Sequence, residues 1–343
     1  MGKAPVVSIV KVNGCSIERA VNESIDLVEG FTDLQDKRSV SIKPNLCSLK
    51  SVSSGSTTDP RIVEAVIKRV NAETTCKINI VETNNFQASA DKTFRTLGFL
   101  DLAKKYPNVE CINLSNDVKL KASLNGEVFS TLLIPETMLF SDYLINIAKL
   151  KTHVDYRYTG ALKNAYGFLL SSRALYHGFM HKALVDLNRV YKPDLSIIDA
   201  VIGMEGFGPT GGSPKYVGVI LASKDPVAAD TVAAQIAGIK PSKIKYLKYA
   251  EEKGIGKSRD IEVVGCSIED VKTNFKFIPL RLYYIGRLSL TIQRFSKHCF
   301  NFARLLSLVR STLVTISFST LEERSSYMGL LRLAKDTTFR IDG

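Results

Sequence analysis

Short apolar runs alternate with amphipathic segments along the chain up to residue 265. Runs with the length and β-branched content of buried strands lie at residues 6–12, 39–42, 77–81, 143–147, 195–201, 216–223 and 261–265. Apolar residues with helical spacing lie between them, at residues 17–30, 60–70, 91–106 and 227–237. This alternation predicts an α/β fold with a mostly parallel sheet that helices cover on both faces.

Two of these helices have a start signal in the sequence. Thr58 or Asp59 is the expected N-cap of one helix and Asp225 that of another, and in both a proline occupies the first helical position. Polar residues also end three strands, at Lys43 and Asn45, at Glu82, and at Asp199. Ligands of open α/β sheets bind beyond the carboxyl ends of strands, so we expect these side chains to share a cleft.

We expect an α/β domain over residues 1–274, with two lobes, 1–140 and 141–274, around this cleft. A basic, helical extension is expected over residues 275–343. The net charge of +12 supports this division, because residues 272–343 hold twelve Lys or Arg against four Asp or Glu. Residues 277–321 contain no acidic side chain.

A basic helical extension is consistent with three roles. Such a segment packs on the body, lies on an anionic membrane surface as a peripheral element, or binds a protein partner. No apolar run in it approaches the roughly 20 residues of a membrane span. Nucleic acid is a disfavoured partner, because the body has neither a recognised binding motif nor an extended basic field.

The six cysteines include no Cys-x-x-Cys pair. This spacing argues against a disulfide framework, a local zinc site and an iron–sulfur cluster. The apolar run at residues 6–10 is too short for a signal peptide or a membrane span. We therefore expect a cytoplasmic protein, with peripheral membrane attachment if the extension binds a bilayer.

Candidate chemistry concentrates in residues 151–181, which hold three of the four histidines. Lys163 lies between Gly160 and Gly167, and a lysine in a crowded, partly dry site acts as a base or Schiff-base former. His177 and His181 are four residues apart, which on a helix places both rings on one face.

We therefore predict that Lys163, His153, His177 and His181 are catalytic, and that His177, His181 and Asp199 hold a divalent metal. The predicted binding residues for a small anionic substrate are Lys43, Asn45, Thr58, Asp59, Lys151, Asn164, Arg173, Gly206 and Gly208.

Each of these residues also has a structural interpretation. In that interpretation Lys163 bridges carboxylates such as Asp199, and His177 and His181 are a buried or a surface pair. Arg173 then forms a salt bridge at the surface. The loop at residues 203–212 has a Gly-x-Gly pair but no Rossmann pattern, because prolines interrupt it and a strand follows.

Several stretches resemble the domain-of-unknown-function family numbered 362. They span about residues 39–265 in order: Ile42-Lys-Pro-Asn, Thr57-Thr-Asp-Pro, Lys151-Thr-His, Gly160-Ala-Leu-Lys-Asn-Ala-Tyr-Gly, Ile198-Asp-Ala-Val-Ile-Gly-Met-Glu-Gly-Phe-Gly-Pro and Ala222-Ser-Lys-Asp-Pro-Val-Ala-Ala-Asp. The resemblance implies a shared pocket but no reaction. Many members carry a ferredoxin-like module with clustered cysteines, and this chain departs from that pattern, so no iron–sulfur cluster is expected.

The order His153, Lys163, His177 and His181 is also similar in kind to the nickel-pincer lactate racemases. There, a histidine, a glycine-flanked lysine and later histidines line a cofactor cleft, so this similarity is one of fold and residue order. We predict an enzyme that acts on a small anionic substrate by proton transfer or metal-assisted chemistry, as an isomerase or lyase. The alternative is a non-enzymatic cofactor-binding, metal-binding or scaffold protein that uses its basic tail for association.

Overall fold

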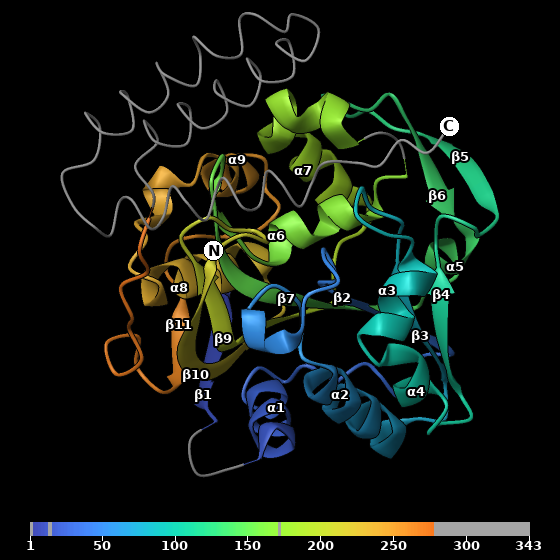
Figure 1. The fold of residues 1–343 in the computed structure, drawn as a ribbon, viewed down its shortest axis with the longest axis horizontal. Coiled ribbons are helices and arrows are strands. Elements are labelled where there is room, and N and C mark those ends of the chain that lie inside the picture. Colours follow the sequence, from blue (N-terminus) through green and yellow to red (C-terminus); the bar gives the residue numbers. More distant parts are fainter. Residues whose placement is uncertain (1–2, 13–15, 171–172, 278–343) are drawn as a thin grey trace, which may run out of the picture. The chain divides into compact units, whose positions relative to one another are not determined.

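One large sheet forms the centre of the protein (Figure 1). The structure is a computed structural model that describes residues 3–12, 16–170 and 173–277. Within these ranges the sheet has nine strands in the order β11-β1-β10-β9-β7-β2-β3-β4, with β8 paired to β7. Their bounds are β1 Val6–Lys11, β2 Ser39–Pro44, β3 Lys77–Glu82, β4 Val109–Asn113, β7 Tyr143–His153, β8 Arg157–Thr159, β9 Leu195–Glu205, β10 Ser213–Ser223 and β11 Glu262–Gly265.

Most neighbouring strands are parallel. Strands β9, β7, β2, β3 and β4 run in one direction, whereas β10 is antiparallel to both β9 and β1. The predicted mostly parallel α/β fold is confirmed. Strand β2 pairs directly with β7, so the strands of both predicted lobes belong to one sheet and the boundary near residue 140 does not divide it.

Helices cover both faces of the sheet, and each face has its own apolar core. In Figure 1, α1 to α4 lie on one side of the strands and α6 to α9 on the other. The helices are α1 Ile17–Asp26, α2 Pro60–Glu73, α3 Ala90–Thr96, α4 Phe99–Ala103, α5 Glu136–Leu139, α6 Ala161–Asn164, α7 Met180–Val190, α8 Pro226–Ile236 and α9 Lys245–Glu252. Short 3₁₀ helices are η1 Val52–Ser54, η2 Ala165–Phe168, η3 Arg173–Phe179 and η4 Pro241–Lys243, and a separate hairpin joins β5 Lys119–Ser123 to β6 Thr131–Pro135.

The predicted helix starts are correct in both cases. Asp59 caps α2 by accepting a hydrogen bond from the Arg61 amide at 2.9 Å, so Asp59 rather than Thr58 is the N-cap. Asp225 caps α8 by accepting from two amides of its first turn. The single helix predicted over residues 91–106 is wrong, because Gly98 has a φ of +80° and separates α3 from α4.

Strand β7 is longer than the apolar run that predicted it. It continues through Lys149 and Lys151 to His153, and all three side chains are buried, at 1%, 1% and 7% exposure. Alternate residues of a strand share a face, so these three point to the same side of the sheet. The glycine-rich loop is also shorter than expected, because β9 continues to Glu205 and β10 begins at Ser213, in an antiparallel hairpin.

The chain divides into two units, residues 1–275 and 276–343. The predicted basic extension lies outside the described residues from position 278 onward. Among the helices of the described ranges, none combines the length and apolarity that a membrane crossing requires.

Candidate functional site

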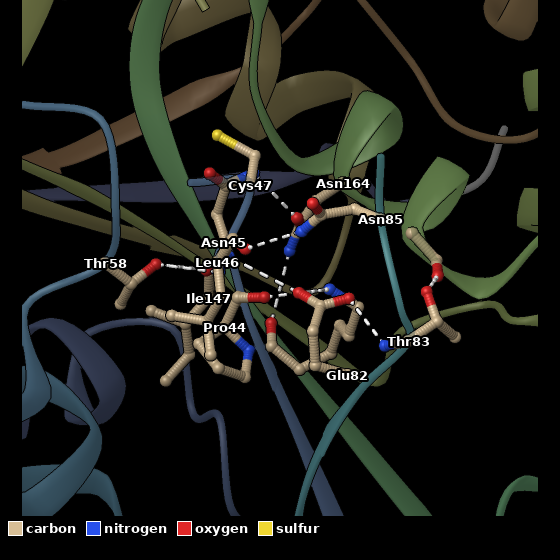
Figure 2. A network of polar contacts seen from close by, with 12 residues as sticks. Pro44, Asn45, Leu46, Cys47, Thr58, Glu82, Thr83, Asn85, Ile147 and Asn164 are labelled. Carbon is tan, nitrogen blue, oxygen red and sulfur yellow. Dashed lines mark hydrogen bonds and ion pairs between the residues drawn. The ribbon is translucent and has the colours of Figure 1, made fainter. Parts of the chain in front are cut away.

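Polar side chains from β2, β3, β7 and α6 meet at the carboxyl ends of the parallel strands (Figure 2). The sheet dictates this meeting, since β2, β3 and β7 are adjacent and end at the same edge. Lys43, Asn45 and Glu82 therefore lie close together at this edge, and the cleft that they and Asp199 are expected to share stays a prediction.

Lys43 and Glu82 form a buried ion pair across β2 and β3. Their Nζ and Oε2 atoms are 2.8 Å apart, and Lys43 is 1% exposed. Glu82 also accepts hydrogen bonds from the amides of Leu46 and Thr83, as Figure 2 shows. Burial lowers the pKa of Lys43, and the Glu82 carboxylate opposes this shift. Lys43 is thus engaged within the protein, and its predicted substrate contact stays a prediction.

Three asparagine side chains connect α6 to the ends of β2 and β7. Asn164 of α6 accepts a hydrogen bond from the Asn45 side chain at 3.0 Å (Figure 2). Its own amide nitrogen donates to Asn146 Oδ1 at 2.7 Å. Asn164 also donates to the Lys43 carbonyl at 3.2 Å. Asn164 therefore fixes α6 against the ends of β2 and β7.

Lys149 and Asp199 form a second ion pair, with both side chains fully buried and Nζ 2.8 Å from Oδ2. The same Asp199 oxygen accepts from the Asp59 amide at 2.9 Å, so the pair also holds the start of α2. Thr58 bridges Asn45 and β7, since its hydroxyl accepts from the Asn45 amide and donates to the Ile147 carbonyl. Asp59, Thr58 and Asp199 have structural partners here.

Lys151 differs from these two lysines in having no carboxylate partner among the described residues. Its ammonium donates to Asn45 Oδ1 at 2.8 Å, to the Ser56 carbonyl at 2.8 Å and to Cys47 Sγ at 3.2 Å. Burial lowers its pKa most, and the Cys47 sulfur opposes that shift. Lys151 therefore brings a buried positive charge to the site, solvated by one thiol and two neutral oxygens.

Two tyrosine rings surround the Lys163 ammonium. Its Nζ lies 5.6 Å from the ring centre of Tyr156 and 6.0 Å from that of Tyr166. Burial, together with the positive charges of Lys151 and Arg173, lowers the pKa of Lys163 to about 8. Within the described residues this ammonium has no hydrogen bond and no ion pair. The bridging of Lys163 to Asp199, one reading of the sequence, is not what the structure has.

His153 and His177 flank the same tyrosines. The His153 ring centre is 4.9 Å from that of Tyr156, and the His177 ring is 5.9 Å from Tyr166. Burial lowers the pKa of His153 well below its ordinary value, and Lys163 adds to this shift. The Nδ1 atom of His153 accepts from the Asp155 amide at 3.1 Å, so its proton is on Nε2. Three of the four residues predicted to be catalytic, Lys163, His153 and His177, thus lie around the same two tyrosines.

Arg173 anchors η3 to the site. Its guanidinium donates to the Thr83 hydroxyl, to the Gly167 carbonyl at 2.8 Å and to the Leu169 carbonyl at 3.3 Å. Burial lowers the pKa of Arg173, and Glu82 is the largest opposing influence. Among the described residues Arg173 has no salt bridge, so the surface salt-bridge reading of the sequence is wrong.

His181 lies in other surroundings. It lies in the first turn of α7, whereas His177 belongs to η3, so the single helix assumed from their spacing is absent. The His181 ring contacts Tyr249, at 5.2 Å between centres. Among the described residues, no three His, Cys, Asp or Glu side chains form a group that could hold a metal ion. The predicted ligands His177, His181 and Asp199 do not come together.

The loop between β9 and β10 packs on the end of β7. Thr152 donates to the Gly206 carbonyl at 3.0 Å, and the Val154 amide donates to the Gly208 carbonyl at 3.2 Å. A Cβ atom on Gly208 would lie 1.9 Å from the Thr152 carbonyl oxygen. These glycines permit close packing of the loop, and their predicted contact with a substrate stays a prediction.

A buried carboxylate holds the start of α6. Asp230 of α8 accepts from the Ala161 amide at 2.6 Å, from the Leu162 amide at 3.0 Å and from the Tyr158 hydroxyl at 3.1 Å. A Cβ on Gly160 would lie 2.0 Å from the nearer Asp230 oxygen, so a glycine at position 160 leaves the room that this carboxylate needs. Burial raises the pKa of Asp230 to about 7 against the effect of these donors. Asp230 therefore positions the short helix that carries Lys163.

Sequence reasoning missed several members of this site. Cys47 follows Asn45 by two residues, and the two tyrosines lie inside the segment already singled out. Asp230 ends the last stretch that resembles the family. Each of these residues lies in or beside a stretch that the sequence had already singled out. The sequence does not show which residue each of them contacts. The missed residues are Cys47, Asn146, Tyr156, Tyr166 and Asp230.

Comparisons with known proteins cover this whole site. Residues 40–235, more than half of the chain, match the family described as a domain of unknown function, DUF362. The chain is 28% identical over 224 residues to a thylakoid-associated protein of Synechocystis sp., a match that covers 63% of this chain and 68% of that protein.

Among solved structures, the lactate racemase apoprotein of Thermoanaerobacterium thermosaccharolyticum is similar with a TM-score of 0.41 and 12% sequence identity. The match covers 68% of this chain and 57% of that one, so the chain spans less than two thirds of that structure.

Proposed function

This chain belongs to the DUF362 family, and from its site we propose an enzyme that acts on a small anionic substrate by proton transfer. Lys163 is the proposed proton carrier, with His153 as its neutral neighbour. Lys151 and Arg173 attract the anion. The reaction class is an isomerisation or a lyase step.

The observation that carries this proposal is the state of the Lys163 amino group. It lies between two tyrosine rings without a hydrogen bond or an ion pair among the described residues, and its pKa is lowered to about 8. A general base or acid works best when its pKa is close to the working pH. An ordinary surface lysine has a pKa near 10.4 and is almost fully protonated at neutral pH.

The charge balance of the site favours an anionic ligand. Lys43 and Lys149 are each neutralised by a carboxylate, whereas Lys151, Lys163 and Arg173 have none among the described residues. A bound carboxylate or phosphate would supply the missing negative charge and would accept charge-assisted hydrogen bonds. The cations without a carboxylate partner therefore support an anionic substrate.

Deuterium exchange tests the proposal directly. The protein is incubated in D₂O with a panel of 2-hydroxy, 2-oxo and amino acids, and loss of C–H signals is followed by NMR. We expect exchange into at least one compound, and Lys163→Met to slow it about 10²-fold, because a positioned acid or base contributes on that order. Lys104→Met, which removes an exposed lysine, is the matched control.

The possible results separate the two functions. Unchanged exchange in Lys163→Met would contradict the proposed role of this residue. Binding of an anion by the native protein without any exchange would favour the alternative, a binding protein. Circular dichroism checks folding, and Lys163→Met is expected to fold because an ammonium that loses hydration on burial costs free energy.

The affinity for a small anion is expected to depend on pH through Lys163. With oxalate as the probe, the affinity should fall about fivefold between roughly pH 7 and 9.5, as one nearby positive charge is lost. The sign follows from the pKa of about 8, since the ammonium that attracts the anion is present below that pH and absent above it. Isothermal titration calorimetry measures this profile. A pH slope that persists in Lys163→Met would assign the effect to another group.

We also propose that residues 277–321 bring this activity to an anionic membrane surface. The segment has no acidic residue, and a relative is named a thylakoid-associated protein. Its basic side chains attract anionic headgroups. We expect the full chain to sediment with phosphatidylglycerol vesicles and not with phosphatidylcholine vesicles. Arg294→Glu combined with Arg304→Glu should release it, whereas equal binding to both vesicle types would exclude this surface.

A further inference from the structure

We propose that Lys163 forms a Schiff base with the carbonyl group of its substrate, which makes the substrate a small 2-oxo acid. This inference rests on the proposed function and names its substrate class. It gives the lysine a covalent role in addition to proton transfer.

The amine of Lys163 is more available for attack than those of the other lysines of the site. The ammonium groups of Lys43, Lys149 and Lys151 are each held by hydrogen bonds to the protein, at 2.8 Å for the shortest in each case. Among the described residues Lys163 has no such bond, and its Nζ lies over the faces of Tyr156 and Tyr166. Among these four lysines of the site, it alone can attack a carbonyl carbon without first giving up a hydrogen bond.

The short helix that carries this amine is fixed in position. Lys163 lies on α6, and the start of this helix is bound to Asp230 through two amides. The next residue, Asn164, is bound to Asn45 and Asn146. The backbone that carries Lys163 is therefore already in place for attack, which lowers the entropic cost of the reaction.

Arg173 is a candidate binding group for the carboxylate of a 2-oxo acid. Arg173 uses its Nε and Nη2 atoms for protein carbonyls and the Thr83 hydroxyl, whereas Nη1 has no hydrogen bond among the described residues. Its charge, like that of Lys151, is felt at Lys163 and lowers the pKa of that amine. A 2-oxo acid has a carboxylate next to a carbonyl group. Its carboxylate would pair with Arg173 and Lys151, and its carbonyl group would lie beside the Lys163 amine.

The covalent step balances without an added oxidant. The neutral Lys163 nitrogen uses its lone pair to bond the carbonyl carbon, the carbonyl π pair moves to oxygen, and one proton of the nitrogen is transferred to that oxygen to give a hydroxyl group. Loss of a second proton from nitrogen and of the hydroxyl group as water then gives the imine. At pH 7.5 a lysine of pKa about 8 has on the order of 10²-fold more neutral amine than an exposed one. Burial and the nearby cations thus supply the reactive form.

Reductive trapping tests the inference on the full-length protein. Glyoxylate, the smallest 2-oxo acid, is added at pH 7.5 with sodium cyanoborohydride, which delivers hydride to the imine carbon while water protonates the nitrogen. Peptide mapping by mass spectrometry then locates carboxymethyl-lysine. We expect labelling of Lys163 at least about tenfold faster than of exposed Lys104, and none at position 163 in Lys163→Arg.

A second aldehyde and a second variant test the substrate class. Acetaldehyde lacks a carboxylate and should label Lys163 at least about tenfold more slowly than glyoxylate, given the size of a charge-assisted contact. Arg173→Gln should reduce the glyoxylate rate by a clearly larger factor than the acetaldehyde rate, because acetaldehyde is affected only through the pKa of Lys163 and not through a lost carboxylate contact. Equal rates with both aldehydes would overturn the 2-oxo acid assignment, and labelling confined to exposed lysines would overturn the Schiff base. If deuterium exchange persists in either case, proton transfer by Lys163 still holds.

Discussion

Replacing Lys149 by methionine is expected to lower the free energy of unfolding by about 3–5 kcal/mol, because it leaves a buried carboxylate without its counter-charge. Lys149 and Asp199 are cross-strand neighbours on β7 and β9, and neither side chain is exposed. The two other donors to Asp199 are the amides of Asp59 and Val201, which are neutral. They cannot replace the ammonium.

Urea unfolding of single and double variants measures this effect. Lys149→Met combined with Asp199→Leu should lose less stability than the sum of the single changes, because it removes both charges and leaves neither one unpaired. Lys68→Met, which breaks the exposed Lys68–Glu18 pair, is the matched control and should change stability little. A Lys149→Met variant as stable as that control would contradict the ion pair's structural importance.

This pair also explains where prediction from the sequence stopped. The apolar run at residues 143–147 was enough to predict a strand, but the strand continues six residues further, to His153. Lysines at 149 and 151 are typical of exposed loops, because a buried charge is costly. Their burial depends on Asp199 and on Asn45 and Ser56, which are distant in the sequence. Hydrophobic periodicity carries no information about such partners.

The candidate site divides in the same way. Histidine density and glycine spacing were enough to find Lys163 and His153, which the structure brings together around Tyr156. The predicted pairing of His177 with His181 assumed that both residues belong to one helix. This assumption is wrong, and a four-residue spacing indicates a common face only within one helix. A helical boundary falls between the two residues, at Phe179.

Replacing Asp230 by alanine is expected to cost about 3–5 kcal/mol of unfolding free energy, since three buried donors lose their acceptor and each unsatisfied group costs about 1–3 kcal/mol. The donors are the amides of Ala161 and Leu162 and the hydroxyl of Tyr158. Two of them belong to the first turn of α6, so the variant should also disturb the position of Lys163.

The matched change is Asp230→Asn, which keeps one carbonyl oxygen in the same place and should lose clearly less stability than Asp230→Ala. Gly160→Ala tests the same contact from the other side, because its new Cβ would lie 2.0 Å from Asp230 Oδ1 and 2.2 Å from the Tyr158 hydroxyl oxygen. Thermal and urea unfolding measure the three variants, and glyoxylate labelling of Lys163 measures the site. If Asp230→Ala is destabilised while labelling stays at the native rate, Asp230 stabilises the fold without positioning Lys163. If labelling falls in Asp230→Ala and is restored in part by Asp230→Asn, the support of α6 by this carboxylate is what holds the amine in its reactive place.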